Sequence, residues 1–425
     1  MNTMADVSGN SSQHVDWRGI EAAGTPDGPN RHDEVRTVVT PLLLILAGVC
    51  FILAGHAIVG AILLVLGLLV GIFQFAVGAV FAHFVLRRGS NIFAALAKFA
   101  QPGVKHRSAQ DEADPDDDPH EVQIDRTVGF ALTRKSAEGG FFCMGMSDED
   151  IATRKQHVLE ERLALYDWLM AGPEFVEVST EADDGVRLWA HAWVNPQASG
   201  RWVVLCHGYA GTWGSMLQYA RPWAQAGYNL LIVSMRGHER SGGRFIGMGY
   251  LDGPDVVCWA KYLLAPDAGL PAATDIMLMG QSMGAHAVLN ASGRDDLPAQ
   301  VRAIFSDCGF DAMWNTLEHI AKSFELPCHP TLELIRRYMR HVPGGFDIAC
   351  DDAAAQVAKS RTPILFLQGT ADTTVGAGCV RRLYEAAACE KDVLLVDGAG
   401  HCMASLLVPD VYWGRVLGFA QAHLG

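Results

Sequence analysis

The sequence has no excess of basic residues. Lys and Arg total 33 against 47 Asp and Glu, which gives a formal net charge of -14. Nucleic-acid binding depends on Lys and Arg gathered against phosphates, so this charge balance gives it no electrostatic support. RNA- and DNA-binding signatures are also missing, and nucleic acid is not an expected partner.

The ten cysteines lack any C-x-x-C pair and any paired Cys/His spacing. The usual sequence signs of a zinc site are therefore missing, and we expect no metal and no other cofactor. A chain of this length can bury a sizeable core without disulfides. The simplest expectation is a set of free, mostly buried thiols in a reducing compartment.

Residues 37–86 lack charge altogether: no Lys, Arg, Asp or Glu occurs between Arg36 and Arg87. As a single helix this stretch would be roughly 75 Å long, whereas the hydrocarbon core of a bilayer is about 30 Å thick. A helix in a soluble hairpin would need a polar face, which this stretch does not have. The sequence therefore predicts a transmembrane segment, with the lipid bilayer as a partner.

Two crossings fit the length of this segment better than one long, tilted span. We place them near 38–57 and 61–83, with a turn around 56–60, inside a transmembrane region assigned to 38–86. Basic residues on both sides of a hairpin place both flanks, and the enzyme domain, in the cytoplasm. A single span gives the same side for its C-terminal flank. The basic residues are Arg31, Arg36, Arg87, Arg88, Lys98, Lys105 and Arg107.

Composition sets the other boundaries. Polar residues dominate the beginning of the chain, which we expect to be disordered, and an acidic run with prolines indicates a solvated spacer. A short interfacial helix is possible just after the membrane segment. The predicted regions are a tail over 1–37, a linker over 87–147 that includes the interfacial helix at 88–100 and the acidic run at 111–125, and a catalytic domain over 148–425.

Within the catalytic domain, short apolar runs alternate with helical stretches. After a helix predicted over 148–170, eight strand candidates follow from about residue 174. Alternating β and α units predict a mostly parallel, doubly wound sheet, whose first two strands would form an antiparallel edge hairpin. Helical stretches between the sixth and seventh strands, about 311–361, predict a small cap over the site.

The stretch Gly280-Gln281-Ser282-Met283-Gly284 lies between an apolar strand and a helical stretch. That context is typical of a nucleophile elbow, where the serine occupies a strained strand-to-helix turn. Gly280 and Gly284 leave room where side chains would collide with the turn. Ser282 is therefore the predicted nucleophile.

A serine nucleophile needs a base, and the base needs an orienting acid, in the chain order Ser, acid, His. Asp372 and His401 follow Ser282 in that order, and each comes just after a predicted strand. The carboxyl ends of parallel strands are where doubly wound sheets build their sites. Asp307, which ends the sixth predicted strand, is the alternative acid.

An oxyanion hole would complete this site. One donor should be the backbone N–H of Met283, the residue after the nucleophile, and the other should come from the loop after the third strand. That loop reads HGYAG from His207 to Gly211, which makes the N–H of Tyr209 the best candidate. His207 itself is expected to be structural.

Several of these motifs are similar to those of one group of enzymes. HGYAGTWGSMLQYA, GYNLLIVSMRGHERSGG, GQSMGA, SDCGF and the GTADTTV and GAGH pair resemble the α/β-hydrolase superfamily, in the Bem46-like and YqkD-like group near the serine aminopeptidases. The resemblance covers about 200–425. It implies the α/β-hydrolase fold, Ser282, Asp372 and His401 as the triad, and Tyr209 and Met283 as oxyanion donors. Glu239 departs from the pattern, because many relatives have glycine there.

The expected function is therefore that of a membrane-anchored serine hydrolase acting on small-molecule or lipid-like carboxylic esters. A peptidase or amidase is the alternative, because the same triad serves both reactions. A non-catalytic membrane-tethered scaffold is the second alternative. The sequence indicates no obligate protein partner.

Overall fold

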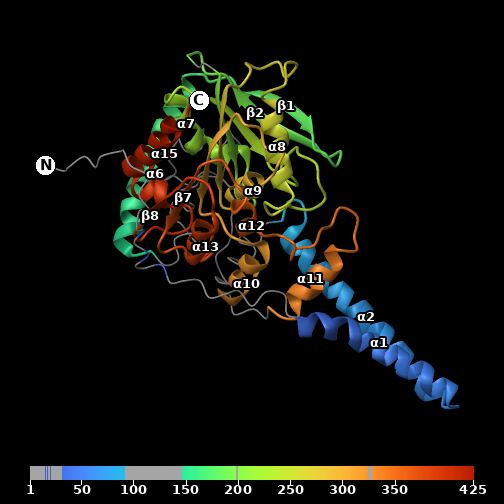
Figure 1. The fold of residues 1–425 in the computed structure, drawn as a ribbon. Helices are drawn as coiled ribbons and strands as arrows, with labels where there is room; N and C mark the ends of the chain where they lie inside the picture. Colours follow the sequence, from blue (N-terminus) through green and yellow to red (C-terminus); the bar gives the residue numbers. More distant parts are fainter. Residues whose placement is uncertain are drawn as a thin grey trace, which may run out of the picture.

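The computed structural model describes most of the chain and shows a catalytic body with a projecting pair of helices (Figure 1). The predicted tail, interfacial helix and acidic run fall largely or wholly outside the described residues. Those residues are Val15, Trp17, Ile20 and the ranges 31–90, 146–197, 200–323 and 328–425.

Eight strands form one sheet in the order β1-β2-β4-β3-β5-β6-β7-β8. β1 pairs antiparallel with β2, and β2 antiparallel with β4, while all later neighbours are parallel. The predicted eight-stranded, mostly parallel sheet with an antiparallel edge hairpin is thus confirmed. The strands are β1 Val176–Glu181, β2 Arg187–Trp193, β3 Arg201–Cys206, β4 Asn229–Ser234, β5 Asp275–Gln281, β6 Val301–Asp307, β7 Ile364–Gly369 and β8 Lys391–Val396.

Helices cover both faces of the sheet, which explains why the central strands are apolar on every residue rather than on alternate ones. One face packs against α8 Asp252–Tyr262, α9 Met283–Ser292, α12 Ala353–Val357 and α13 Gly378–Ala386. The other face packs against α6 Asp148–Met170, α7 Leu217–Gln225, α14 Ala404–Leu407 and α15 Pro409–Ala422. The short helix η2 Trp213–Met216 leads into α7.

Helix α6 has the bounds that its periodicity predicts. The Ser147 side chain accepts a hydrogen bond from the Asp150 backbone N–H at 3.1 Å, which caps the first turn. Three acidic residues follow in that turn, where the helix dipole favours negative charge. At the other end Gly172 adopts a φ of 85°, a left-handed conformation that glycine tolerates and that stops the helix.

The uncharged segment forms two antiparallel helices, α1 Arg31–Leu53 and α2 Ala57–Leu86, joined through residues 54–56. Helix α1 starts seven residues before the predicted membrane region, and the turn comes slightly earlier than the predicted 56–60. A Cβ on Gly60 would lie 2.5 Å from the Gly48 carbonyl oxygen, so the two backbones touch there. Close approach through small residues is typical of helices that pair within a membrane.

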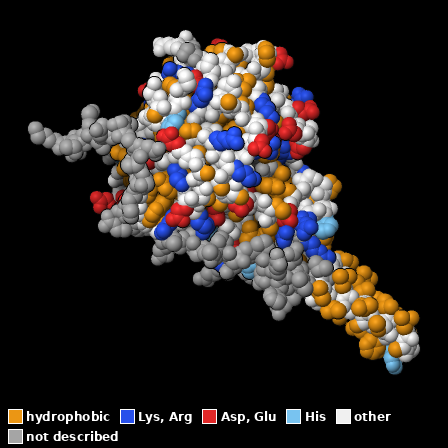
Figure 2. Space-filling view, viewed as in Figure 1, with side chains coloured by type: hydrophobic (Ala, Val, Ile, Leu, Met, Phe, Trp, Pro, Cys, Tyr) orange, Lys and Arg blue, Asp and Glu red, His pale blue; other side chains and the backbone are white. Residues whose placement is uncertain are grey.

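The outer surface of this pair of helices is apolar and exposed, in contrast to the mixed charges on the body (Figure 2). Helix α2 is long and apolar enough to cross a membrane, whereas the apolar part of α1, Val39–Leu53, is shorter. Exposed apolar surface on this scale marks contact with lipid or protein. The described residues thus contain one helix that could be a membrane anchor or a signal sequence.

The predicted cap consists mainly of α10 Met313–Ser323 and α11 Thr331–Met339. Trp314, Leu334 and Met339 are buried, as side chains that hold a cap in place would be. Helix α11 also packs against α2: a Cβ on Gly78 would lie 2.2 Å from the Leu334 carbonyl oxygen. The cap therefore connects the catalytic body to the projecting helices.

Candidate active site

Ser282 lies on the turn between β5 and α9, with a φ of 54° that non-glycine residues rarely adopt. The glycines on either side make this turn possible. A Cβ on Gly280 would lie 2.1 Å from the Gly284 carbonyl oxygen, and a Cβ on Gly284 would lie 2.1 Å from the Cys206 carbonyl oxygen. Backbone strain at this position is a known feature of functional sites, and it holds the hydroxyl out of the turn.

His401 connects Ser282 to Asp372. Its Nε2 lies 2.8 Å from Ser282 Oγ, and its Nδ1 lies 2.8 Å from Asp372 Oδ2. The three residues are 119 and 29 positions apart in the chain, and they meet because β5, β7 and β8 end at the same edge of the sheet. This is the geometry in which a base can remove the serine proton while an acid orients the base.

Asp372 is held from several directions. Its Oδ1 accepts the backbone N–H groups of Thr374 and Val375 at 2.9 and 3.2 Å, and its Oδ2 also accepts from Gln368 Nε2 at 2.8 Å. Burial would raise the pKa of Asp372, but the His401 ring and these hydrogen bonds outweigh it and lower the pKa below its ordinary value. Asp372 is therefore ionised and fixed in orientation.

His401 is fully enclosed, and burial by itself would lower its pKa. The adjacent Asp372 carboxylate has the larger combined effect and raises the pKa of His401 above the ordinary value. A more basic imidazole is a stronger proton acceptor from a hydroxyl. The same shift means that the neutral, proton-accepting form of His401 requires a higher pH.

Asp307, the alternative acid, lies close by but in a different arrangement. Its Oδ2 accepts hydrogen bonds from the hydroxyls of Tyr219 and Tyr412, both at 2.8 Å. Its backbone carbonyl accepts the Ser282 N–H at 2.8 Å. Burial raises the pKa of Asp307, although the two tyrosine hydroxyls oppose this. The geometry therefore favours Asp372 as the partner of His401 and gives Asp307 a supporting position under the elbow.

The loop after β3 approaches the elbow as the sequence suggests. A Cβ on Gly208 would lie 3.4 Å from Ser282 Cβ, so the backbone of this loop runs directly beside the nucleophile. His207 accepts the Met235 N–H on Nε2 at 3.1 Å and donates from Nδ1 to the Gly208 carbonyl at 2.8 Å. Burial lowers the pKa of His207 to about 3, so it is a neutral, structural residue that shapes the loop. The oxyanion roles of Met283 and Tyr209 stay predictions.

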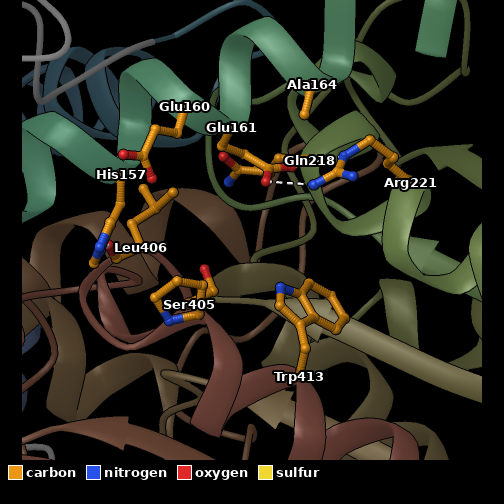
Figure 3. Close-up of a pocket in the computed structure, with 10 residues that line it drawn as sticks. His157, Glu160, Glu161, Ala164, Gln218, Arg221, Ser405, Leu406 and Trp413 are labelled. Carbon is orange, nitrogen blue, oxygen red and sulfur yellow. Dashed lines mark hydrogen bonds and ion pairs between the residues drawn. The ribbon is translucent and has the colours of Figure 1, made fainter. Parts of the chain in front are cut away.

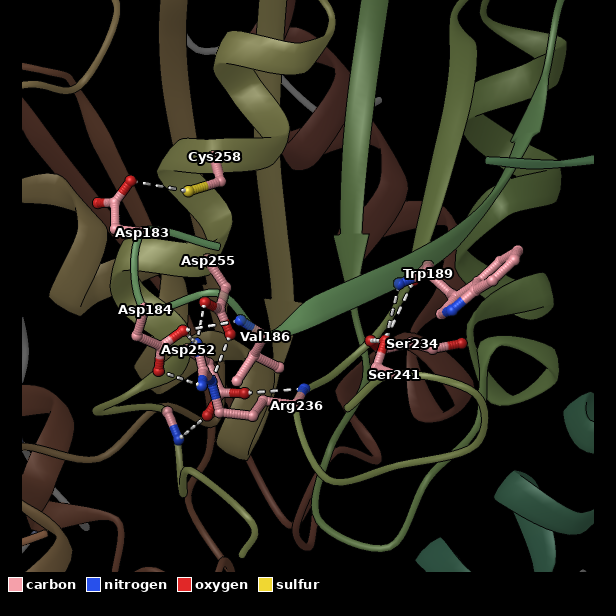
Figure 4. Close-up of polar contacts among 11 residues, drawn as sticks. Asp183, Asp184, Val186, Trp189, Ser234, Arg236, Ser241, Asp252, Asp255 and Cys258 are labelled. Carbon is pink, nitrogen blue, oxygen red and sulfur yellow. Dashed lines mark hydrogen bonds and ion pairs between the residues drawn. The ribbon is translucent and has the colours of Figure 1, made fainter. Parts of the chain in front are cut away.

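An ionic network, buried at Arg236, Asp252 and Asp255 and exposed at Asp184, fixes the neighbouring loop after β4 (Figure 4). The Arg236 guanidinium bonds to Asp255 at 2.6 and 2.9 Å and to Asp184 at 2.7 and 3.1 Å. Asp252 accepts the backbone N–H groups of Arg236 and Gly249 at 3.2 and 2.8 Å. Bidentate pairing of this kind fixes geometry as well as charge, so both ends of the loop between β4 and α8 are held rigidly.

His286 has a structural role that the sequence does not indicate. It is fully buried and bonds to the Phe310 carbonyl at 2.6 Å and to Asp351 at 2.7 Å. Asp351 also accepts the Met313 backbone N–H at 2.6 Å. Burial opposes a charge on His286, but Asp351 outweighs it and raises the pKa. This pair ties α9, which carries the elbow, to the start of the cap.

The cap histidines also have structural partners. His319 bonds to the Thr373 carbonyl at 2.8 Å, beside Asp372, and His329 pairs with Glu333 at 2.5 Å. His341 bonds to the Arg337 carbonyl at 2.6 Å. The contact of His319 places α10 over the loop that carries the acid.

Two thiols border His401. The Cys402 backbone N–H donates to Cys308 Sγ at 3.1 Å, and one ligand atom from each of Cys308, Cys402 and His401 lies within 4.8 Å of the others. Both nitrogens of the His401 ring already bond to Ser282 and Asp372, so the ring cannot take a metal while these contacts are made. Burial raises the pKa of both thiols, Cys402 to about 11, which keeps them protonated.

A surface pocket lies elsewhere, between α6, α7 and the α14–α15 region (Figure 3). Its walls include the ion pair of Arg221 with Glu161, which are 2.5 Å apart. Ser282, His401 and Asp372 are not among its lining residues. Catalysis therefore has no direct connection to this pocket.

Parts of this chain are similar in sequence to known proteins. Residues 197–341 match the family model described as serine aminopeptidase, S33. The chain is 25% identical over 214 residues to the uncharacterized protein YqkD of Bacillus subtilis, a match that covers 50% of this chain and 68% of that protein.

Two solved structures have a lower sequence identity to this chain than YqkD has. An esterase of Pyrococcus furiosus has a TM-score of 0.47 and 22% identity, covering 60% of this chain and 92% of that one. A puromycin-hydrolyzing peptidase of Mycobacterium tuberculosis has a TM-score of 0.46 and 19% identity, covering 60% and 40%. With the sheet order, the elbow and the sequence matches taken together, the chain is an α/β-hydrolase enzyme of the serine-hydrolase type, similar in sequence to the serine aminopeptidase family and to YqkD.

Proposed function

We propose that this protein is a membrane-anchored serine hydrolase that cleaves carboxylic esters through Ser282, His401 and Asp372. The observation that carries the proposal is the continuous line of two 2.8 Å contacts from Ser282 Oγ through the His401 ring to Asp372. The left-handed backbone at Ser282 supports it further, since a turn without chemistry has no need for that strain.

The proposed reaction has two halves. His401 Nε2 takes the proton of Ser282 as Oγ attacks the acyl carbon, and the backbone N–H groups of Met283 and Tyr209 stabilise the oxyanion. His401 then gives this proton to the departing alcohol, which leaves an acyl-enzyme. Water, deprotonated by His401, attacks the acyl carbon and releases the acid, and the proton returns to Ser282.

The apolar helices support an apolar substrate. The section of α2 before its contact with α11, residues 57–74, would extend about 27 Å, close to the thickness of a hydrocarbon core. Its side chains are largely exposed and apolar, as lipid-facing residues are. An enzyme held at this surface would meet esters that partition into membranes, so we propose acyl-lipid or other apolar esters as substrates.

Amide hydrolysis is the second candidate, because the matched family model is named for serine aminopeptidases. The same triad would serve, with an amine in place of the alcohol as leaving group. A panel of esters with increasing acyl length, run beside amino-acid amides, separates the two. Activity that rises with acyl length supports the ester proposal, whereas hydrolysis confined to the amides would replace it with the peptidase.

The nucleophile is tested by labelling the full chain with a fluorophosphonate probe. We expect the wild type to label and hydrolyse esters, and Ser282→Ala to lose both down to background. Ser292→Ala, at the far end of the same helix, is the matched control, because its hydroxyl only bonds to the Leu289 carbonyl. Folded wild type that neither labels nor turns over would reject the enzyme and favour a scaffold.

A further inference from the structure

The C-terminal end of α2 lies within the catalytic body. Ala82 and Leu86 are fully buried and Val85 is 7% exposed, whereas Val80 on the opposite side of the helix is 67% exposed. The buried side chains belong to the same core as α8 and α9. One end of the proposed membrane helix is therefore a structural part of the enzyme.

The last carbonyl groups of α2 are capped by residues near the active site. A helix leaves its last four carbonyls without partners inside the helix, and buried ones need partners from elsewhere. Here the Tyr209 hydroxyl donates to the Val85 carbonyl at 2.6 Å, and the Ile246 N–H donates to the Leu86 carbonyl at 2.6 Å. Tyr209 belongs to the loop after β3, which borders Ser282. Ile246 belongs to the loop between β4 and α8, which lies next to the first loop.

Arg88, just beyond α2, extends the attachment. Its backbone N–H donates to the Arg244 carbonyl at 3.1 Å, and its guanidinium donates to the Ser241 carbonyl at 2.6 Å and to the Glu239 carbonyl. Glu239 in turn accepts the Trp213 N–H at 2.9 Å on its side chain. Glu239, which departs from the family pattern, thus joins the end of α2 to η2. Helix η2 follows the loop after β3, residues 207–211, which we call the oxyanion loop.

The oxyanion loop is held from a second side by the same region. The Ala210 N–H donates to His238 Nε2 at 3.3 Å, and His238 Nδ1 donates to the Arg236 carbonyl at 3.0 Å. Burial lowers the pKa of His238 to about 4, so its Nε2 stays an acceptor. Tyr209 and Ala210 are therefore fixed between α2 and a loop that α2 itself contacts.

We infer that the end of α2 positions the oxyanion hole, and that Tyr209 is the positioning residue that links them. The Tyr209 side chain bonds to the helix, while its backbone N–H is the proposed donor to the oxyanion. A shift of α2 would therefore move this donor. The inference rests on the proposed function and adds to it: seating of the membrane segment and turnover at Ser282 are coupled.

The test uses the full chain in lipid nanodiscs and compares Tyr209→Phe with Tyr262→Phe. Tyr262 is a matched control, because its hydroxyl also bonds to a backbone carbonyl, that of Ala268 at 3.1 Å, but belongs to α8 and its following loop. Losing an oxyanion donor costs about 10²–10³ in kcat, so a misplaced one should cost about ten-fold. KM should stay unchanged, because the oxyanion exists only after attack.

Binding of an aryl trifluoromethyl ketone, whose serine adduct carries an oxyanion, should weaken by the same factor in Tyr209→Phe. Arg88→Gln removes the contacts of an exposed side chain to the Ser241 and Glu239 carbonyls and leaves the apolar core intact. This variant should lower kcat to a smaller extent, and it carries the test if Tyr209→Phe does not fold. Wild-type kcat in both folded variants, or a rise in KM alone, would overturn the coupling. A folded wild type that neither hydrolyses esters nor reacts with the fluorophosphonate probe would overturn the proposed function as well.

Discussion

Ser282, His401 and Asp372 depend on one another through their protonation states. His401 accepts a proton only when it is neutral, and Asp372 raises its pKa. Asp372 in turn keeps a lowered pKa because the imidazole and backbone N–H groups surround it. Asp307 is buried in the same region but bonds to two tyrosines. Changing each carboxyl separately therefore distinguishes their contributions.

The pH profile of kcat/KM makes this distinction measurable. Activity should fall as pH decreases through the pKa of His401, and because Asp372 raises that pKa the acid limb should lie above the ordinary histidine value of about 6.5. Asp372→Asn should move the limb to lower pH and reduce kcat by roughly 10³–10⁴-fold. Asp307→Asn, the control, should leave the limb in place. If Asp307→Asn moved the acid limb and Asp372→Asn did not, Asp307 would replace Asp372 as the proposed acid.

Helix α9 begins directly after Ser282, the proposed nucleophile, and is attached to the cap by His286. Both imidazole nitrogens face oxygen acceptors, the Phe310 carbonyl and the Asp351 carboxylate, so the ring is held as a cation. Asn290 also donates to Asp351 at 3.1 Å. A buried charge with this many partners holds two elements together, and here it connects α9 to the start of the cap.

Replacing His286 should therefore destabilise the protein. His286→Gln leaves the Asp351 carboxylate buried without its counter-charge, which costs about 3–5 kcal/mol in the free energy of unfolding. Because the folded-state pKa of His286 is raised, its stabilisation is complete below the unfolded value near 6.5 and is lost as pH rises through the folded value. Urea unfolding at pH 6 and pH 9 checks both points.

The control for that measurement is His423→Gln. His423 pairs with Glu390 at 3.2 Å, but Glu390 is 70% exposed, and surface pairs contribute about 0–1 kcal/mol. If His286→Gln were no more destabilising than His423→Gln, or if its effect grew with pH, the inference that His286 is a buried cation would be wrong.

Local patterns in the sequence predict the helices, the strands and the elbow well. Helix α6 and the G-x-S-x-G turn depend on neighbouring residues, so both can be recognised directly. The attachment of α2 to the body cannot be recognised in this way, because Val85 and Tyr209 are 124 residues apart and neither belongs to a motif that indicates the other. The same holds for Asp351, which lies 65 residues from His286.

The whole molecule combines a negatively charged body with a pair of helices that is uncharged apart from the first turns of α1. The net charge of -14 is spread over the rest of the chain, while residues 37–86 have none. Both ends of the helical pair lie near the body, and its turn lies at the far end (Figure 1). Such a hairpin would keep the body on one side of a bilayer, with Arg87 and Arg88 on the body's side of the membrane.

The side on which we expect the body to lie is predicted from those basic residues. Arg87 and Arg88 come directly after α2, and positive residues next to a span stay in the cytoplasm. We therefore expect a C-terminal tag to resist protease added to sealed vesicles whose outer face is the extracytoplasmic one, and to be cleaved once detergent opens them. In vesicles of the opposite orientation the tag should be cleaved without detergent. Cleavage from the extracytoplasmic face of intact vesicles would contradict this orientation, while leaving the contacts between α2 and Tyr209 as they are.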